Sequence, residues 1–389
     1  MSLIRISANV YNVGVINPFI RLRHINKKCE YGTANNSYFI DDRKTALIDI
    51  VDGELFDDFL YNLGLISDIG NIDYLILNRI APQKGESIRR MLEISPKTVI
   101  VCTQEGKRLL DNVLNKGYNC VVAGNGDKLK LGNSILEFIT TPMLPSPDSM
   151  ATYFENDSVL FSGAMFGSDF CQPSGIDEDI IYVDEYMDEV KNYFDYYLMP
   201  FKEYVKKALE TFAEKAIYCI APQYGVVITE KIEEITEKYT QWCLPCEKKG
   251  AVVLYLSTSG YTKEMAEVVA SSFENNNINV TIVDIKNITP KECAKLVRSS
   301  EYVAVGSSTF NKGLPDVMVK TLSKIGCINN ENKKFFAFGS YGWSGEGVDI
   351  IAVFLQLCGM KQLSKPFKVC MKPTEDDLKT IGEIIKKNI

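Results

Sequence analysis

The sequence predicts an α/β protein of two domains, the second of which is a doubly wound parallel sheet. From residue 1 to about 240, short β-rich runs and later helical stretches form an irregular mixture, which is typical of two sheets covered by helices. After residue 250, five apolar runs alternate regularly with five helical segments, as in parallel strands joined by crossover helices. The 389 residues have room for more than one hydrophobic core.

The strands of the first domain are predicted from runs rich in β-branched, aromatic or aliphatic residues. They include Ser37 to Ile40, Thr45 to Ile50, Tyr74 to Leu77, Thr98 to Cys102, Ile135 to Thr140, Ser158 to Ser162 and Ala216 to Ala221. Helices are expected at Glu54 to Leu63, Glu86 to Glu93, Glu105 to Leu114, Asp184 to Leu198, Phe201 to Glu214 and Ile232 to Cys243.

The domain boundary is predicted near residue 250, because Leu244 to Gly250 contains a proline and a charged cluster. We therefore expect domains over 1–245 and 251–389. The strands of the second domain are expected at Ala251 to Ser257, Asn279 to Asp284, Tyr302 to Gly306, Lys334 to Gly339 and Phe367 to Met371. Its helices are expected to begin at Lys263, Pro290, near Asp316, at Val348 and at Thr374.

Composition and charge narrow the choice of partners. The net charge of −7 and the pI near 5.2 give no sign of a basic surface that would bind phosphate groups. We therefore expect neither nucleic acid nor a membrane as a partner. No apolar run approaches the ~20 residues that span a bilayer, and the N-terminus does not resemble a secretory signal. The eleven cysteines lack the spacing of a secreted disulfide framework. A cytoplasmic location is expected.

Three loops of the second domain are predicted to lie at one edge of its sheet, where ligands bind in such folds. The first, Ser257 to Thr262, supplies hydroxyls and backbone N–H groups at a helix N-terminus, which suits a phosphate monoester. The other two contain glycines, which let a planar ring approach the backbone, and aromatic residues that can stack on it. They run over Gly306 to Gly313 and Gly339 to Gly345.

These loops resemble those of flavodoxin, and more closely those of the flavodoxin domain of the A-type flavoproteins, or flavodiiron proteins. The resemblance implies FMN as the cofactor. Ser259 stands where that family often has an aromatic residue, and Tyr261 beside it carries a ring. The residues expected to bind FMN are Ser257, Thr258, Ser259, Gly260, Tyr261, Thr262, Ser308, Thr309, Phe310, Asn311, Gly313, Ser340, Tyr341, Gly342, Trp343 and Gly345.

The first domain resembles the metallo-β-lactamase-like domain of the same family, which implies an αββα sandwich. The segments that carry the resemblance are Ala46-Leu47-Ile48-Asp49, Thr141-Pro142-Met143-Leu144, Pro147-Asp148-Ser149-Met150, Leu198-Met199-Pro200-Phe201 and Ala221-Pro222-Gln223. In the family this domain carries a dinuclear iron site held mostly by histidine and carboxylate ligands.

The residues at the ligand positions of this sequence differ from the family's pattern. Four of these positions come after Asn78 and hold Arg79, Ala81, Gln83 and Lys84. The other three lie in or beside the later matching segments and hold Pro145, Ala164 and Tyr224. None is a good ligand for iron, and two cations beside two metal ions would repel them. We therefore predict no metal site.

Two interpretations of this altered pocket stay open. In the first, it is a filled site whose groups pair with the backbone or with internal carboxylates such as Glu86. In the second, Arg79, Lys84 and Tyr224 bind a small anionic substrate. The family's head-to-tail dimer, in which the FMN of one subunit faces the metal site of the other, would place that substrate beside a flavin. A homodimer of this kind or a dimer of dimers is expected.

Cys243 and Cys246 form a Cys-x-x-Cys pair at the domain junction, which is either two linker cysteines or a dithiol that exchanges electrons with FMN. The lone His24 is expected to have a structural or surface role rather than a catalytic one.

The resulting prediction is a redox flavoprotein that exchanges electrons between FMN and a redox protein donor or acceptor. It would act as an FMN-dependent oxidoreductase or as an electron carrier. Without the diiron site, it would reduce neither dioxygen nor nitric oxide. The alternative is a non-catalytic FMN-binding sensor or scaffold with a degenerate lactamase-like dimerisation domain.

Overall fold

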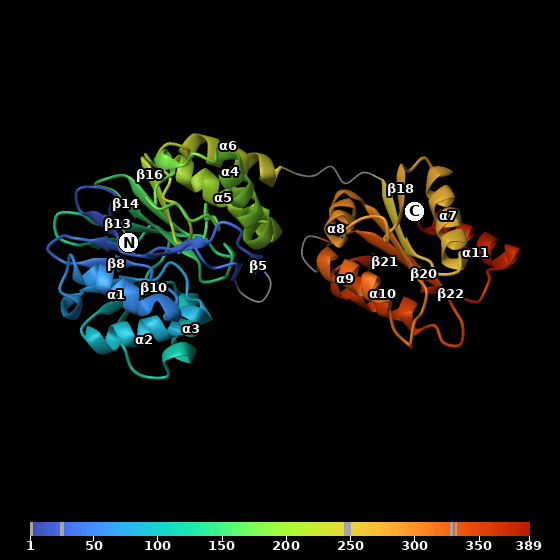
Figure 1. The fold of residues 1–389 in the computed structure, drawn as a ribbon, viewed down its shortest axis with the longest axis horizontal. Helices are drawn as coiled ribbons and strands as arrows, with labels where there is room; N and C mark the ends of the chain where they lie inside the picture. The colour runs from blue at the N-terminus through green and yellow to red at the C-terminus, as the bar shows by residue number, and fades with distance from the viewer. Residues whose placement is uncertain (1–2, 24–26, 245–249, 327–329, 331–332) are drawn as a thin grey trace. The chain divides into compact units, whose positions relative to one another are not determined.

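The computed structural model describes residues 3–23, 27–244, 250–326, 330 and 333–389, and the chain divides into two compact units, Met1–Leu244 and Pro245–Ile389 (Figure 1). The linker predicted at the junction lies mostly outside the described residues. Each unit has its own hydrophobic core.

Unit 1 contains two sheets packed face to face. The first has seven strands in the order β1 (Ile4–Arg5), β2 (Val10–Asn12), β7 (Tyr38–Ile40), β8 (Ala46–Ile48), β9 (Tyr74–Ile76), β10 (Val99–Cys102) and β11 (Cys120–Val122). The second has five, β12 (Lys128–Lys130), β13 (Ile135–Thr140), β14 (Met150–Phe154), β15 (Val159–Gly163) and β16 (Cys219–Pro222). Two short ribbons accompany them, β3 (Val15–Asn17) with β6 (Thr33–Asn35), and β4 (Leu22–Arg23) with β5 (Lys27–Lys28).

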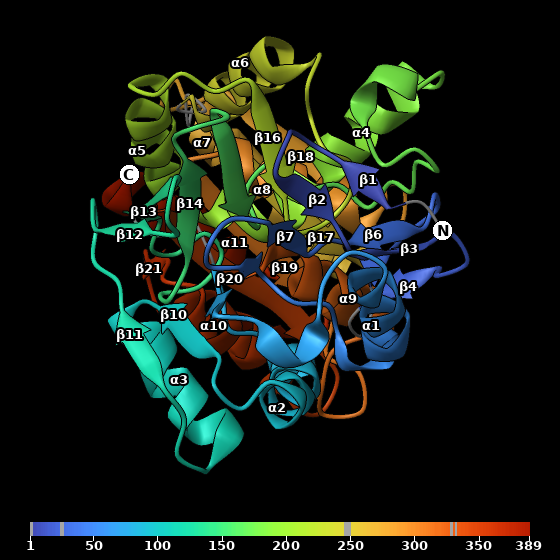
Figure 2. The same ribbon diagram turned by 90° about the vertical axis from the view of Figure 1, so that its left-hand side faces the viewer.

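Helices cover the outer face of each sheet, as Figures 1 and 2 show. The seven-stranded sheet packs against α1 (Phe56–Gly64), α2 (Gly85–Ile94) and α3 (Gln104–Leu114). The five-stranded sheet packs against α4 (Val183–Tyr193), α5 (Lys202–Ala213) and α6 (Ile232–Cys243). Between the sheets, apolar residues of both inner faces form a third cluster. The arrangement is the expected αββα sandwich.

Short helical turns connect these elements. They are η1 (Gly53–Leu55), η2 (Ile69–Asn71), η3 (Pro82–Lys84), η4 (Asp177–Asp179), the π-helical η5 (Phe194–Leu198) and η6 (Met199–Phe201).

Unit 2 is a single parallel sheet with helices on both faces. Its strands run in the order β18 (Val280–Asp284), β17 (Ala251–Leu256), β19 (Tyr302–Ser307), β20 (Lys334–Tyr341) and β21 (Lys361–Gln362), and β22 (Phe367–Cys370) also pairs with β20. One face packs against α8 (Pro290–Ser299), α9 (Asp316–Ile325) and α10 (Glu346–Leu357), and the other against α7 (Tyr261–Glu274) and α11 (Glu375–Asn388).

The sequence predicted five strands for this sheet, and the fifth is divided in two. Strand β21 pairs with the start of β20 and β22 with its end. Pro366 lies between them and has no N–H group to donate to the sheet, so a proline at this point agrees with the interruption.

Candidate functional site

The three predicted loops of unit 2 meet at the carboxyl ends of β17, β19 and β20, which are neighbouring parallel strands. The hydroxyl oxygens of Thr258 and Ser308 lie 3.4 Å apart, and those of Thr262 and Ser340 lie 2.9 Å apart. The backbone N–H of Thr309 donates to the carbonyl of Ser340 at 3.2 Å. The structure therefore brings all three loops together.

The first loop forms a hydroxyl-lined turn at the N-terminus of α7. The Ser257 hydroxyl accepts from the backbone N–H of Gly260 at 3.1 Å. Gly260 has a φ of +89°, and a Cβ added there would meet nothing within 4 Å, so open space borders the loop. Ser259 is exposed beside it. Neutral hydroxyls and N–H groups at a helix N-terminus are a suitable donor set for one phosphate.

Aromatic side chains border the same loops. Trp343 is 77% exposed and Phe310 is 60% exposed, while Tyr261 and Tyr341 are partly exposed. Large rings left in solvent at the mouth of a site can stack on a planar ligand.

The second loop makes a tight turn in which Phe310 and Gly313 exchange backbone hydrogen bonds of 3.0 and 2.8 Å. Asn311 within it has a φ of +48°. In the third loop, Gly342 and Gly345 are exposed or partly exposed.

In unit 1, the predicted pocket residues lie at the carboxyl ends of strands from both sheets. Asp49 follows β8, Arg79 lies just beyond β9, Lys84 ends η3, and Tyr224 follows β16. Because β8 and β9 are parallel, as are β15 and β16, these ends gather on one side of the sandwich. We call Arg23, Lys27, Asp49, Arg79, Lys84, Asp148, Asp169 and Tyr224 the strand-end cluster.

Tyr224 is the centre of the strand-end cluster. Its ring centre lies 4.1 Å from the guanidinium carbon of Arg23 and 5.3 Å from Nζ of Lys84, both within cation–π range. Burial works to lower the pKa of Arg79, but the neighbouring Tyr224, Tyr193 and Asp148 outweigh it and raise that pKa. The structure thus brings Arg79, Lys84 and Tyr224 together.

The carboxylates of the strand-end cluster are mostly engaged by other groups. Asp49 accepts from the backbone N–H and the side-chain amide of Asn78, both at 3.1 Å. Burial raises the pKa of Asp49, and Lys84 opposes that effect. Asp148 accepts from the Ile80 N–H at 2.7 Å and from the Ser146 hydroxyl at 2.6 Å.

Glu86, the carboxylate that the sequence suggested as a counter-ion, has a different partner. It forms an ion pair with Arg89 at 2.5 Å on the surface of α2. It is the second residue of α2 and its side chain is exposed. Sequence reasoning instead missed Arg23 and Lys27, which both pair with Asp169, at 2.5 and 2.8 Å. Their separation along the chain left no pattern by which to find this triad.

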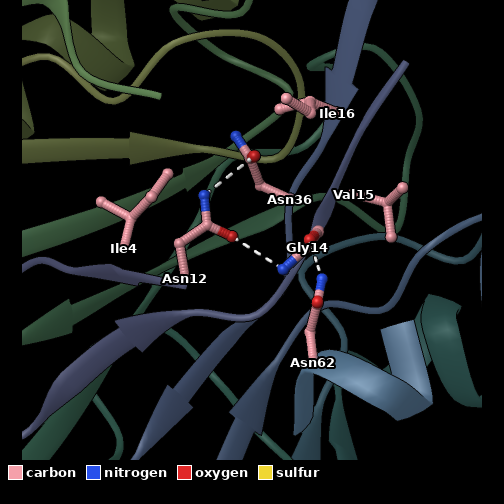
Figure 3. Close-up of a pocket in the computed structure, with 7 residues that line it drawn as sticks. All are labelled: Ile4, Asn12, Gly14, Val15, Ile16, Asn36 and Asn62. Carbon is pink, nitrogen blue, oxygen red and sulfur yellow. Dashed lines mark hydrogen bonds between the residues drawn. The ribbon is translucent and has the colours of Figure 1, made fainter. Parts of the chain in front are cut away.

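Asn36 anchors the segment that carries Tyr224. Its amide donates to the carbonyls of Pro222 and Gly225 at 2.8 and 2.9 Å. It also accepts from Asn12 at 3.0 Å, at the edge of a cavity of about 20 Å³ lined by several asparagines (Figure 3). That cavity has room for about one water, and we assign it a structural role.

The strand-end cluster does not supply a donor set for two iron ions. Arg79 and Lys84 are cations, and the Tyr224 ring lies beside Arg23 and Lys84. Across the described ranges, no three His, Cys, Asp or Glu side chains are grouped so that they could hold a metal ion. The single histidine, His24, lies outside those ranges, as does Cys246. Cys243 is described, and burial raises the pKa of its thiol to about 11.

The comparisons with known proteins agree with both units. Residues 33–225 match the ODP family beta lactamase, and residues 253–383 match the flavodoxin family. Flavo-diiron protein FprA2 of Clostridium acetobutylicum is 32% identical over 400 residues, which cover 100% of both chains. This chain belongs to the flavodiiron protein family. The predicted fold class is confirmed, and so is FMN as the cofactor of this flavoprotein.

Other members of the family are named for their reactions. Anaerobic nitric oxide reductase flavorubredoxin of Escherichia coli K12 is 29% identical over 361 residues, covering 90% of this chain and 74% of that protein. The solved rubredoxin oxygen:oxidoreductase from Desulfovibrio gigas is 27% identical, with a TM-score of 0.74 and coverage of 100% of this chain and 98% of that one.

These names correct the functional prediction. We expected a protein that reduces neither dioxygen nor nitric oxide, or else a non-catalytic sensor, and the relatives point instead to a diiron reductase of nitric oxide or dioxygen. The prediction was wrong because it rested on single ligand positions, whereas similarity over the full chain identifies an oxidoreductase family. Within the described residues, no helix is long and apolar enough to cross a membrane.

Proposed function

We propose that this flavodiiron protein is an FMN-dependent oxidoreductase that reduces nitric oxide or dioxygen, the acceptors named for its relatives. The observation that carries the proposal is the convergence of three loops at one edge of the unit 2 sheet, with hydroxyl contacts of 2.9 and 3.4 Å between them. FMN, when bound, takes electrons from a donor and supplies them one or two at a time to an acceptor.

The residues of the three loops have separate roles in this proposal. The phosphate is held by Ser257, Thr258, Ser259, Thr262 and the N–H groups that begin α7. The ring system lies against Tyr261, Phe310, Tyr341 and Trp343, whose exposure leaves room for stacking. The backbone of Asn311, Gly342 and Gly345 offers polar groups to its polar edge. Ser308, Thr309, Gly313 and Ser340, whose backbone groups bond to other backbone groups of the protein, fix the shape of the loops.

We also propose that the family's iron ligands are replaced in this chain by Arg79, Ala81, Gln83, Lys84, Pro145, Ala164 and Tyr224. The support is chemical, because these side chains are cations, neutral groups or a tyrosine flanked by cations. No reaction step is therefore assigned to iron. We further propose domain limits of 1–245 and 251–389 and a cytoplasmic location. The proposed donor is a redox protein, and the proposed assembly is a head-to-tail dimer or a dimer of dimers.

The test is turnover by the full chain. Purified protein reconstituted with FMN is photoreduced without oxygen and mixed with nitric oxide or dioxygen, and acceptor consumption is followed with an electrode. We expect consumption of one acceptor to exceed that of the same concentration of free reduced FMN. Consumption of both at the free-FMN rate would contradict the proposed function.

A further inference from the structure

Two cations of the strand-end cluster have no carboxylate within ion-pair distance among the described residues. Lys84 is fully buried, and the one hydrogen bond found for its side chain goes to the carbonyl oxygen of Ile50. Within the part of the chain that the structure describes, the buried Nε of Arg79 has no hydrogen-bond partner. A buried cation without a partner is costly, so such sites usually contain a counter-charge.

We propose that Arg79, Lys84 and Tyr224 bind a small, planar, monovalent oxyanion, of the class to which formate and nitrate belong. This inference rests on the proposed replacement of the iron ligands. It goes beyond the proposed function because it assigns the pocket a ligand of its own.

The three side chains offer complementary donors. The Tyr224 hydroxyl is buried and makes no well-aligned hydrogen bond within the described residues, although it lies close enough to Arg79 to raise the pKa of that side chain. Its ring lies 5.3 Å from Nζ of Lys84. The Lys84 ammonium has three N–H groups, of which Ile50 takes one. Arg79 presents a planar fork that matches the two oxygens of a planar anion. Donors from two segments, the β9–α2 connection and the loop after β16, thus lie next to one another.

The charges of the strand-end cluster favour a single negative charge. Arg23 and Lys27 share one carboxylate, Asp169. Asp49 and Asp148 offset Arg79 and Lys84 in part, but their oxygens accept from Asn78, Ile80 and Ser146. Arg79 and Lys84 thus have no carboxylate in ion-pair contact among the described residues, and a monovalent anion between them would supply a local counter-charge. Glu189 lies near Lys27 and accepts from the Asn192 side chain at 3.0 Å, so its charge belongs to the Arg23 and Lys27 side of the cluster.

The burial of these residues limits the size of the ligand. Tyr224 is 2% exposed and Lys84 is fully buried, whereas Arg79 is partly exposed. Entry is therefore expected on the Arg79 side, and a short ligand of three or four heavy atoms is expected rather than a chain.

Thermal unfolding of the full chain tests this site. Wild type, Arg79→Gln, Tyr224→Phe and the control Arg89→Gln are heated in sodium formate, sodium nitrate or sodium chloride at equal ionic strength. Arg89 is a suitable control because it is paired with Glu86 on the surface of α2. At a concentration ten times Kd, formate or nitrate is expected to raise the Tm of wild type and of Arg89→Gln by roughly 3–5 °C above chloride.

The two pocket variants are expected to lose this response. Calorimetric titration of folded protein with formate or nitrate at low temperature keeps the test valid if a variant is less stable. The affinity for the anion is expected to fall about tenfold or more for Arg79→Gln and about fivefold for Tyr224→Phe. Equal responses of wild type and Arg79→Gln, or no response of wild type, would overturn the inference. Neither result depends on turnover, so the proposed function can fail or stand separately.

Discussion

Replacement of Asn36 tests whether this side chain holds the Tyr224 segment in place. Asn36 is 2% exposed, donates to the carbonyls of Pro222 and Gly225, and accepts from Asn12. The variant Asn36→Ala removes all three hydrogen bonds. The variant Asn36→Asp keeps the shape but places carboxylate oxygen against the two carbonyl oxygens.

The expected losses follow from these contacts. Each buried hydrogen bond contributes about 1 kcal/mol, and a buried group left without a partner costs ~1–3 kcal/mol. Asn36→Ala should therefore lower the free energy of unfolding of unit 1 by about 3–5 kcal/mol, toward the low end if water enters from the neighbouring cavity. Asn36→Asp should lose about 1 kcal/mol more, because a charged group is buried among acceptors.

Urea unfolding followed by tryptophan fluorescence measures this loss. The chain has two tryptophans, and Trp242 packs against Phe194 and Tyr239 in unit 1. In a Trp343→Phe background, fluorescence reports on unit 1 alone. The exposed Asn112→Ala serves as control and should change stability by less than about 0.5 kcal/mol. The reasoning is refuted if Asn36→Ala matches this control, or if Asn36→Asp is more stable than Asn36→Ala.

Three further predictions concern other sites. The hydrogen bond from Lys215, at 2.6 Å, lowers the pKa of Glu137 below 4.5. The pair therefore stabilises unit 1 above about pH 4.5, and this stabilisation is lost as the pH falls through the folded-state pKa. Glu137→Gln should lower the free energy of unfolding by about 1 kcal/mol at pH 7, and urea unfolding should show a smaller loss of stability between neutral and acidic pH than in wild type. Thr262→Val should weaken FMN binding by ~1–2 kcal/mol in a fluorescence titration, and unchanged affinity would exclude Thr262 from the phosphate site. Burial raises the pKa of Cys243 to about 11, so mass spectrometry should find it alkylated far more slowly at pH 8 than the exposed Cys370, and equal rates would contradict its burial.

Long, uniform apolar runs made most of the fold predictable. The runs that became β17 and β19 are buried at every position, as expected for central parallel strands. Thr289 and Glu292 form the capping box that begins α8, so that boundary could also be located from sequence. The strands before residue 37 were missed because each has two or three residues, too few to show a period of two.

The candidate sites were predictable to different extents. The FMN loops follow one another in a regular βα pattern, so their meeting could be inferred from topology alone. The strand-end cluster depends on contacts between distant segments, such as that of Arg23 with Asp169, 146 residues apart in the chain. Sequence identified Arg79, Lys84 and Tyr224 through a family resemblance, but not the aspartates that surround them.

The central proposal is that this flavodiiron protein works through FMN while cations stand in the place of the family's iron ligands. Elemental analysis of the purified, FMN-saturated protein tests this claim in one measurement. The sulfur of the 11 Cys and 11 Met gives the amount of protein, phosphorus gives the amount of FMN, and iron gives the amount of bound metal. We predict about one phosphorus and far less than one iron per chain, even after growth with added iron. Two iron atoms per chain would contradict the account.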